Sequence, residues 1–247
     1  MKRNKKSGFT LLELLIVIAI IAILSVALVI VLNPAETLKK SRDAQRISDL
    51  STLKTAIGLY LTSTASPQLD GTTGTANAAC KATVTTGSGG TLATVAWTTS
   101  GKIWYSLPTS SKPIANITLD GGTGGTLPTV TQSATVAAAT QTDGTGWIPV
   151  NFSGLTGGSP ISNLPLDPTN TAATTTVAST DLVYRYACSQ VPLAFEIDAQ
   201  LESTAYTSTD DKRASDGGNA PHYYEVGTNL NILGVIATGT PSDNLNY

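Results

Sequence analysis

The sequence predicts an α+β protein in which a long N-terminal α-helix packs on a C-terminal antiparallel β-sheet domain with Thr/Gly-rich loops. Within residues 9–62, positions 14–32 are almost continuously apolar, and apolar residues then recur at every third or fourth position, which is typical of helices. The last third of the chain contains segments that alternate apolar and polar residues, which is typical of strands. Only 13% of the residues are charged, which suits an extracellular β-rich domain.

The first element is an apolar segment. Residues 14–32 are apolar with the single exception of Ser25. A helix of this length spans about 28 Å, close to the hydrocarbon thickness of a bilayer. The only charges in the first eight residues are basic, namely Lys2, Arg3, Lys5 and Lys6. The positive-inside rule therefore predicts one membrane crossing, with the N-terminus in the cytoplasm and the body outside.

Three interpretations of this segment compete. A secretory signal would use the Ser-x-Ala site that ends at Ala27, but cleavage there leaves the apolar residues 28–32 exposed at a new N-terminus. A plain signal anchor accounts for the membrane crossing. It gives no role to Gly8 before the helix or to Glu13 within it.

The third interpretation rests on residues 5–21, KKSGFTLLELLIVIAII. This stretch resembles the class III leader and helix start of bacterial type IV pilins and type II secretion pseudopilins. The resemblance covers about 25 residues of the chain and combines basic, small, aromatic and acidic residues at fixed offsets. It implies that residues 1–8 are a leader peptide. A prepilin peptidase would cut between Gly8 and Phe9 on the cytoplasmic face and methylate the new Phe9 amine.

Glu13 is the most informative single residue of the apolar segment. A carboxylate inside a membrane helix costs about 2.5–3.5 kcal/mol on insertion scales, so it marks function by default. In a local interpretation, Glu13 pairs with the N-terminus of its own helix. The resemblance implies instead that Glu13 neutralises the Phe9 amine of a neighbouring subunit during assembly.

The helix is expected to be kinked or locally melted at Asn33-Pro34, since proline lacks the N–H group. Apolar spacing then resumes and predicts an amphipathic helix, with Ala44, Ile47, Leu50, Leu53, Ile57 and Leu61 on its packing stripe. The charged residues of this half are expected to lie mostly away from the stripe, namely Lys39, Lys40, Arg42, Asp43, Arg46 and Asp49.

Residues 63–247 are predicted to form an extracellular β-rich domain. Strands are expected at 91–98, 102–107, 114–119 and 146–152. A later strand is expected to carry Leu182, Tyr184, Tyr186 and Cys188 on one face. The next strand alternates at 195–202 and should have one solvent-exposed face that carries Glu196 and Asp198. Residues 164–168, LPLDP, resemble a turn that precedes the sheet in pseudopilin-like proteins.

Two further features concern cross-links and metals. Cys80 and Cys188 lie outside the membrane in this topology, so we expect a disulfide, with two buried free thiols as the alternative. An acidic, turn-rich loop precedes a further strand predicted at 223–226, and oxygen ligands on such a loop suit Ca²⁺. Its residues are Asp210, Asp211, Asp216 and Asn219. Because their spacing matches no calcium motif, a solvated loop is the favoured interpretation, and no cofactor is expected.

Nothing in the sequence indicates an enzyme. Two cysteines and one histidine cannot supply the four ligands of a usual zinc site, and no nucleotide-binding motif is present. Basic residues do not cluster in the body, so nucleic acid is not indicated as a partner.

The resemblance implies a structural subunit of a type IV pilus or pseudopilus, first a single-pass cytoplasmic membrane protein and then part of an extracellular or periplasmic filament. The implied partners are copies of itself and other pilins, the prepilin peptidase, an inner-membrane platform protein and, indirectly, an assembly ATPase. Two alternatives stay open. They are a low-copy minor pilin or pseudopilin of a secretion or DNA-uptake system, and a membrane-tethered binding module that does not polymerise.

Overall fold

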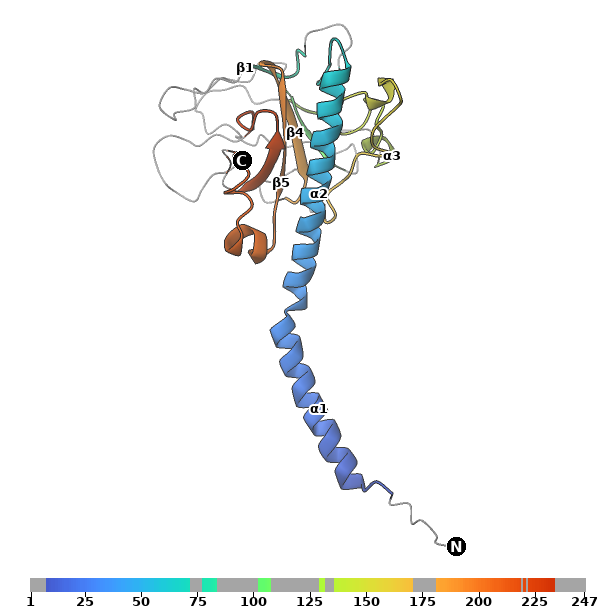
Figure 1. The fold of residues 1–247 in the computed structure, drawn as a ribbon, viewed down its shortest axis with the longest axis vertical. Helices are drawn as coiled ribbons and strands as arrows, with labels where there is room; N and C mark the ends of the chain where they lie inside the picture. The colour runs from blue at the N-terminus through green and yellow to red at the C-terminus, as the bar shows by residue number, and fades with distance from the viewer. Residues whose placement is uncertain are drawn as a thin grey trace, which may run out of the picture.

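The computed structural model describes residues 8–71, 77–83, 102–107, 129–131, 136–170, 181–218, 220 and 222–233. The strands expected at 91–98 and 114–119 lie outside these residues. In Figure 1 the chain begins as a helical stalk that projects away from a body. The second half of the stalk runs up along the β-sheet of that body.

The projecting part of the stalk is helix α1, Leu11–Leu32, which is apolar apart from Glu13 and Ser25. The Ser25 hydroxyl is satisfied within the helix, because it donates to the Ile21 carbonyl oxygen at 2.7 Å. The large apolar side chains of the helix are exposed from Leu11 to Leu28. Among the described residues, α1 is the one helix long and apolar enough to cross a membrane, over Leu11–Leu28.

The predicted interruption at Asn33-Pro34 is confirmed as a break of one residue. Asn33 has φ 36° and ψ 71°, the left-handed conformation that asparagine tolerates better than most residues. It ends α1 and also caps the next helix, α2 (Pro34–Ser63), because its Oδ1 accepts from the Glu36 N–H at 3.4 Å. Pro34 stands in the first turn of α2, where its missing N–H leaves no helical bond unmade.

Helix α2 packs on the sheet through a stripe that differs at one end from the predicted one. The expected residues Leu50, Leu53 and Ile57 are buried. Toward the start of the helix, however, the stripe continues through Asp43 and Arg46, which are fully buried, whereas Ala44 is exposed. The prediction that these two charged side chains lie away from the packed face is therefore wrong.

Within the described residues, the sheet has six strands in the order β3-β2-β4-β5-β6, with β1 paired to β4 outside this path. The strands are β1 Lys81–Thr83, β2 Lys102–Tyr105, β3 Thr129–Thr131, β4 Tyr184–Val191, β5 Ala194–Gln200 and β6 Tyr223–Gly227. Strands β2, β4, β5 and β6 pair antiparallel, as predicted. The pairs β1–β4 and β2–β3 are parallel, so the whole sheet is mixed.

Three short helical elements complete the described fold, namely α3 (Val136–Ala139), a 3-10 turn at Phe152–Gly154 and a π-helical turn at Ala205–Thr209. The strand expected at 146–152 does not form. Residues 146–150 make bends and irregular backbone, and only an isolated bridge joins Asp143 to Asn151. The buried side chains of this segment, including Trp147 and Ile148, fill the core from a loop.

The two faces of the sheet carry two separate cores. On the face toward α2, Tyr184, Tyr186 and Cys188 join the larger apolar cluster, which confirms their predicted common face. On the opposite face, Glu196 and Asp198 are fully buried, so the prediction of a solvent-exposed face on β5 is wrong. The reason is a second layer, formed by Ala220, Ile232, Leu233 and neighbouring residues, which covers that face.

Candidate functional site

The backbone that precedes α1 is open to other molecules. Residues 8–10 are not helical, and the helix begins only at Leu11. The Phe9 side chain is 83% exposed, and a Cβ atom added at Gly8 would meet nothing within 4 Å. The Gly8–Phe9 peptide bond is therefore accessible in the folded chain.

A capping box fixes the side chain of Glu13 at the start of α1. Its Oε2 accepts from the Thr10 backbone N–H at 2.9 Å and from the Thr10 hydroxyl at 2.8 Å. In return, the Glu13 N–H donates to the Thr10 hydroxyl oxygen at 3.2 Å. This reciprocal arrangement satisfies backbone N–H groups that a helix start otherwise leaves without partners.

The other carboxylate oxygen of Glu13, Oε1, takes no part in the capping box. Among the described residues, no hydrogen bond to its Oε1 is formed. Glu13 is also the one charged residue of α1 and lies within the membrane-length segment Leu11–Leu28. The capping bonds offset part of the cost of placing a carboxylate there, and Oε1 keeps the capacity to accept from a donor that approaches α1 from outside.

Between α2 and the body, the buried guanidinium of Arg46 joins the two. The Arg46 Nε donates to Asp167 Oδ2 at 2.7 Å and its Nη2 donates to Asp167 Oδ1 at 3.0 Å, a bidentate pair. Its Nη1 donates to Asp43 Oδ1 at 2.7 Å and to Glu202 Oε1 at 2.9 Å. Burial lowers the pKa of Arg46, but the bonds to these carboxylates outweigh burial and raise it above the ordinary value.

The acidic partners of Arg46 are themselves held by other donors. Asp43 accepts the backbone N–H groups of Glu202 and Ser203, at 3.1 and 2.7 Å, which ties the helix to the segment after β5. The Arg42 guanidinium forms two further bonds to Glu202, each of 2.7 Å. Hydrogen bonding from Arg42, followed by that from Arg46, lowers the pKa of Glu202 to about 2.

The Arg46 cluster was not predicted as a unit. Its signals in the sequence are the 164–168 turn, which contains Asp167, and an acid and a base three residues apart at Asp43 and Arg46. A spacing of three residues on a helix normally indicates a solvent-exposed pair. Only the fold brings Asp167, 121 positions along the chain from Arg46, against the same face.

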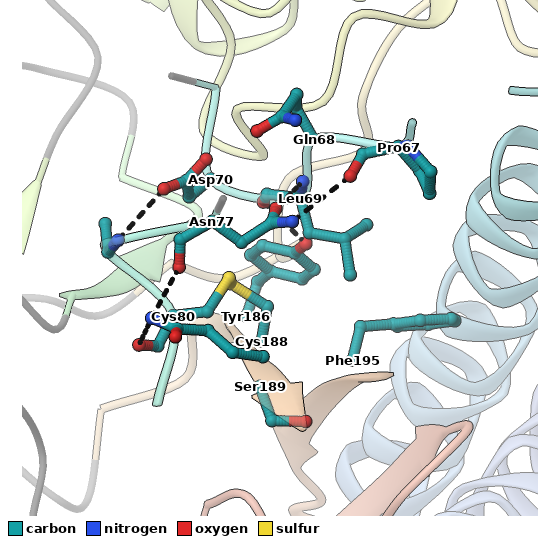
Figure 2. Close-up of a disulfide and its surroundings, with 12 residues drawn as sticks. Pro67, Gln68, Leu69, Asp70, Asn77, Cys80, Tyr186, Cys188, Ser189 and Phe195 are labelled. Carbon is teal, nitrogen blue, oxygen red and sulfur yellow. Dashed lines mark hydrogen bonds between the residues drawn. A yellow bond between two sulfur atoms is a disulfide. The ribbon is translucent and has the colours of Figure 1, made fainter. Parts of the chain in front are cut away.

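The predicted disulfide joins Cys80 to Cys188, with Cα atoms 4.7 Å apart and 108 positions of sequence between them. Figure 2 shows the bridge beneath the segment that contains Leu69 and Asn77. The Tyr186 hydroxyl donates to the Leu69 carbonyl oxygen at 2.8 Å, and the Cys80 N–H donates to the Asn77 carbonyl oxygen at 3.0 Å. The disulfide therefore fastens this segment and β1 to the central strand β4.

The acidic loop considered for calcium is divided among different partners. Asp210 pairs with Lys212 at 2.7 Å, and Asp211 pairs with Arg213 at 2.9 Å. Asp216 accepts backbone N–H groups instead, and Asn219 lies outside the described residues. In the part of the chain that the structure describes, no three His, Cys, Asp or Glu side chains are grouped so that they could hold a metal ion.

Comparison with known proteins identifies one segment of the chain. Residues 3–29 match the model of the prokaryotic N-terminal methylation motif. The chain has no significant match among curated proteins or among solved structures. The matched residues contain the accessible Gly8–Phe9 bond, the capping box and most of the exposed apolar helix. In this N-terminal segment the chain is similar to precursors of the type IV pilin-like kind, and α1 is long and apolar enough to cross a membrane.

Proposed function

We propose that this chain is a structural subunit of a type IV pilus or pseudopilus filament, which is processed by a prepilin peptidase and polymerises through its N-terminal helix. One observation carries the proposal. Glu13, the one charge of an otherwise apolar and exposed helix, is fixed by Thr10 through Oε2 and keeps Oε1 for an external donor.

Processing is the first step. In the proposed topology the basic residues before α1 stay in the cytoplasm and the body lies outside. The peptidase then cuts between Gly8 and Phe9 on the cytoplasmic face and methylates the Phe9 amine. Cleavage creates a positive charge next to α1 at a residue whose side chain is 83% exposed, because Phe9 precedes the first helical residue.

Assembly follows from the pairing of this amine with Glu13. An amine and a carboxylate buried together among apolar helices attract one another more strongly than in water, so an unpaired Glu13 disfavours any packing that leaves it alone. The Phe9 amine of one subunit is the donor we assign to Glu13 Oε1 of its neighbour. The pair sets the axial stagger between subunits, while the apolar side chains of α1 exchange lipid for neighbouring helices.

The energy for assembly is supplied by other proteins. By the resemblance of its leader, extraction from the bilayer depends on a cytoplasmic ATPase that acts through an inner-membrane platform protein. The body, held to α2 by the Arg46 cluster, is carried outward and displayed on the filament surface.

Two matched variants test the role of the Glu13 charge. Glu13→Gln keeps an acceptor in the capping box and removes the charge, whereas Thr10→Val removes the side-chain cap and keeps the charge. We expect Glu13→Gln to abolish filaments in the fraction sheared from cells, while the chain accumulates in the membrane, and Thr10→Val to retain them. Filaments of Glu13→Gln at the normal level would contradict the proposal. Recovery of the unaltered chain only as a membrane-bound monomer would favour a tethered binding module.

A further inference from the structure

The face of the sheet opposite α2 is closed by residues 228–233, which we call the strap. The strap begins beside β5, where the Phe195 N–H donates to the Thr228 hydroxyl at 3.1 Å and the Thr228 N–H donates to the Phe195 carbonyl oxygen at 3.0 Å. Further along, Ile232 and Leu233 bury their side chains in the second apolar cluster. Below them lie apolar side chains of the sheet, so the strap shields this core from water.

Polar contacts of the strap converge on one buried carboxyl group. Oε2 of Glu196 accepts the backbone N–H groups of Ile232 and Leu233, at 2.7 and 2.8 Å. The Ile232 carbonyl oxygen accepts from the buried ammonium group of Lys81 at 3.1 Å. Glu196 is completely buried, so the strap is fastened inside the body rather than at its surface.

A second carboxyl group lies diagonally across the strand pair. Glu196 on β5 is paired with Gly227 on β6. Glu225 lies two positions before Gly227 and so is on the same face of the sheet. Oε2 of Glu225 accepts the Ala220 N–H at 2.9 Å, and the Glu225 N–H donates to Asp216 Oδ2 at 2.8 Å. Glu225 therefore holds the other segment that covers this face of the sheet.

Each of the two carboxyl groups has one oxygen left over. Oε1 of Glu196 and Oε1 of Glu225 are buried and receive no hydrogen bond from a donor group in the described residues. The two side chains lie within hydrogen-bonding reach of one another. Two ionised carboxylates in this position would repel each other without solvent, whereas a proton between the two oxygens satisfies both.

The neighbouring charged groups do not remove the need for a proton between Glu196 and Glu225. The bidentate pair of Arg185 on β4 is formed with Asp198, at 2.7 Å for both bonds, and the Arg185 guanidinium lies 3.5 Å from the centre of the Tyr223 ring. The charges that act most strongly on Glu196 are those of Glu225 and Asp198, and both are acidic. Glu225 is likewise faced by Glu196, Asp198 and Asp216.

We propose that Glu196 and Glu225 share a proton, and that this proton fastens the strap to the sheet, so that the strap loosens as the proton leaves. The device acts in the body and is independent of the assembly role proposed for Glu13. When the strap opens, it uncovers the apolar cluster around Ile103 and Tyr105. The body would thereby expose a new apolar surface in less acidic surroundings.

The sign of the pH dependence follows from burial. Desolvation raises the pKa of Glu196 well above its ordinary value and raises the pKa of Glu225 to about 7. While the strap is closed, Glu196 and Glu225 keep their protons above pH 4.5. When the strap is open, water reaches the two carboxyl groups, and they lose their protons above their ordinary pKa of 4.5. Between pH 4.5 and the raised pKa values, the equilibrium constant for strap opening increases about tenfold per pH unit for each proton that the closed strap retains. The strap is held most firmly in acid.

Hydrogen exchange of the full chain in detergent micelles tests the proposal, followed by mass spectrometry of peptides that contain residues 228–233. After correction for intrinsic exchange rates, protection of the strap should fall at least about a hundredfold between about pH 5.5 and about pH 7.5. Glu196→Gln accepts the strap N–H groups and donates to Glu225 without titrating. Its protection should change by less than about threefold over the same range.

His222 is the matched control, because it is the one histidine of the chain and histidine ordinarily titrates in this range. His222→Gln should keep the pH dependence of the unaltered chain. Equal protection of the unaltered strap at both pH values would overturn the proposal. So would a dependence that His222→Gln removes and Glu196→Gln retains. Added Ca²⁺ that restores protection at the higher pH would also overturn it, since a cation would then occupy the place of the proton.

A measurement on the unaltered chain covers the case in which Glu196→Gln does not fold. The sequence contains five glutamates, so labelling their carboxyl carbons with ¹³C gives few NMR signals. At least one signal should titrate with a midpoint at or above about pH 7, because burial holds a proton on the pair. Midpoints below about pH 5.5 for all five would show that no buried glutamate keeps its proton, and would overturn the proposal.

Discussion

Replacing Arg46 by methionine should weaken the attachment of α2 to the body more than any other single change on that helix. The guanidinium is completely buried and donates to Asp167, Asp43 and Glu202, with the shortest bonds at 2.7 Å. Methionine fills much of the same volume but donates nothing, so two buried carboxylates lose their counter-charge. Breaking a buried ion pair in this way costs about 3–5 kcal/mol.

Thermal unfolding of the full chain in detergent, followed by circular dichroism, measures this cost. At about 2–4 °C per kcal/mol for a protein of this size, Tm should fall by about 6–20 °C. Arg42→Met is the matched control, because the Arg42 side chain is 34% exposed and its ion pair in this cluster is with Glu202. Its loss should cost less than about 1 kcal/mol.

A second substitution separates lost charge pairing from lost packing. Asp167→Asn in the Arg46→Met background keeps an acceptor for the Thr169 and Asn170 N–H groups and removes the buried charge. We expect it to recover at least about 1 kcal/mol of the loss. A stabilising role of the buried ion pairs is excluded if Arg46→Met lowers Tm no more than Arg42→Met does, or if adding Asp167→Asn lowers Tm further.

Three other predictions concern the body. Replacing Cys80 and Cys188 by serine opens a cross-link across 108 positions and should cost up to about 4–5 kcal/mol, seen as a lower Tm than that of the oxidised chain but close to that of the reduced chain. Arginine bonds hold the Glu202 pKa near 2, below its ordinary 4.5, so the stabilisation is complete above pH 4.5 and is lost as the pH falls toward 2. Acid titration of Glu202→Gln should therefore show a flatter loss of stability over that range. Gly71→Ala should cost more than Gly157→Ala in urea unfolding, because both have positive φ but only at Gly71 would the Cβ lie 2.9 Å from other heavy atoms.

Local patterns in the sequence predicted the parts of the fold that depend on neighbouring residues. The apolar run predicted α1, and the proline after Asn33 predicted the break, because both effects act within one or two helical turns. Alternation predicted the shared face of Tyr184, Tyr186 and Cys188. The disulfide could be predicted because the chain offers one possible pair of cysteines.

The buried charges could not be predicted by the same reasoning. A periodicity analysis assigns a charged residue to solvent, since burial of an unpaired charge is costly. Arg46 and Glu196 are buried nonetheless, because their partners come from distant parts of the chain. Asp167 lies 121 positions from Arg46, and the Leu233 N–H lies 37 positions from Glu196. Only the assembled fold supplies these partners.

The candidate site was predicted in part. Gly8, Phe9 and Glu13 were singled out by their offsets in the leader, and residues 3–29 match the methylation motif. The capping box was missed, although Thr10 and Glu13 have its three-residue spacing. Its consequence, that one Glu13 oxygen is engaged while the other stays available, required the side-chain geometry.

The mass of the N-terminal peptide, measured on filaments sheared from the cell surface, tests both the processing and the filament role. We expect a peptide that begins at Phe9 and carries one methyl group on its amine. That result would show processing, retention of the apolar helix and presence in a filament together. A peptide that begins at Met1, or one that begins after Ala27, would contradict the proposed cleavage. Absence of the chain from sheared filaments, with all of it in the membrane fraction, would contradict the proposed function.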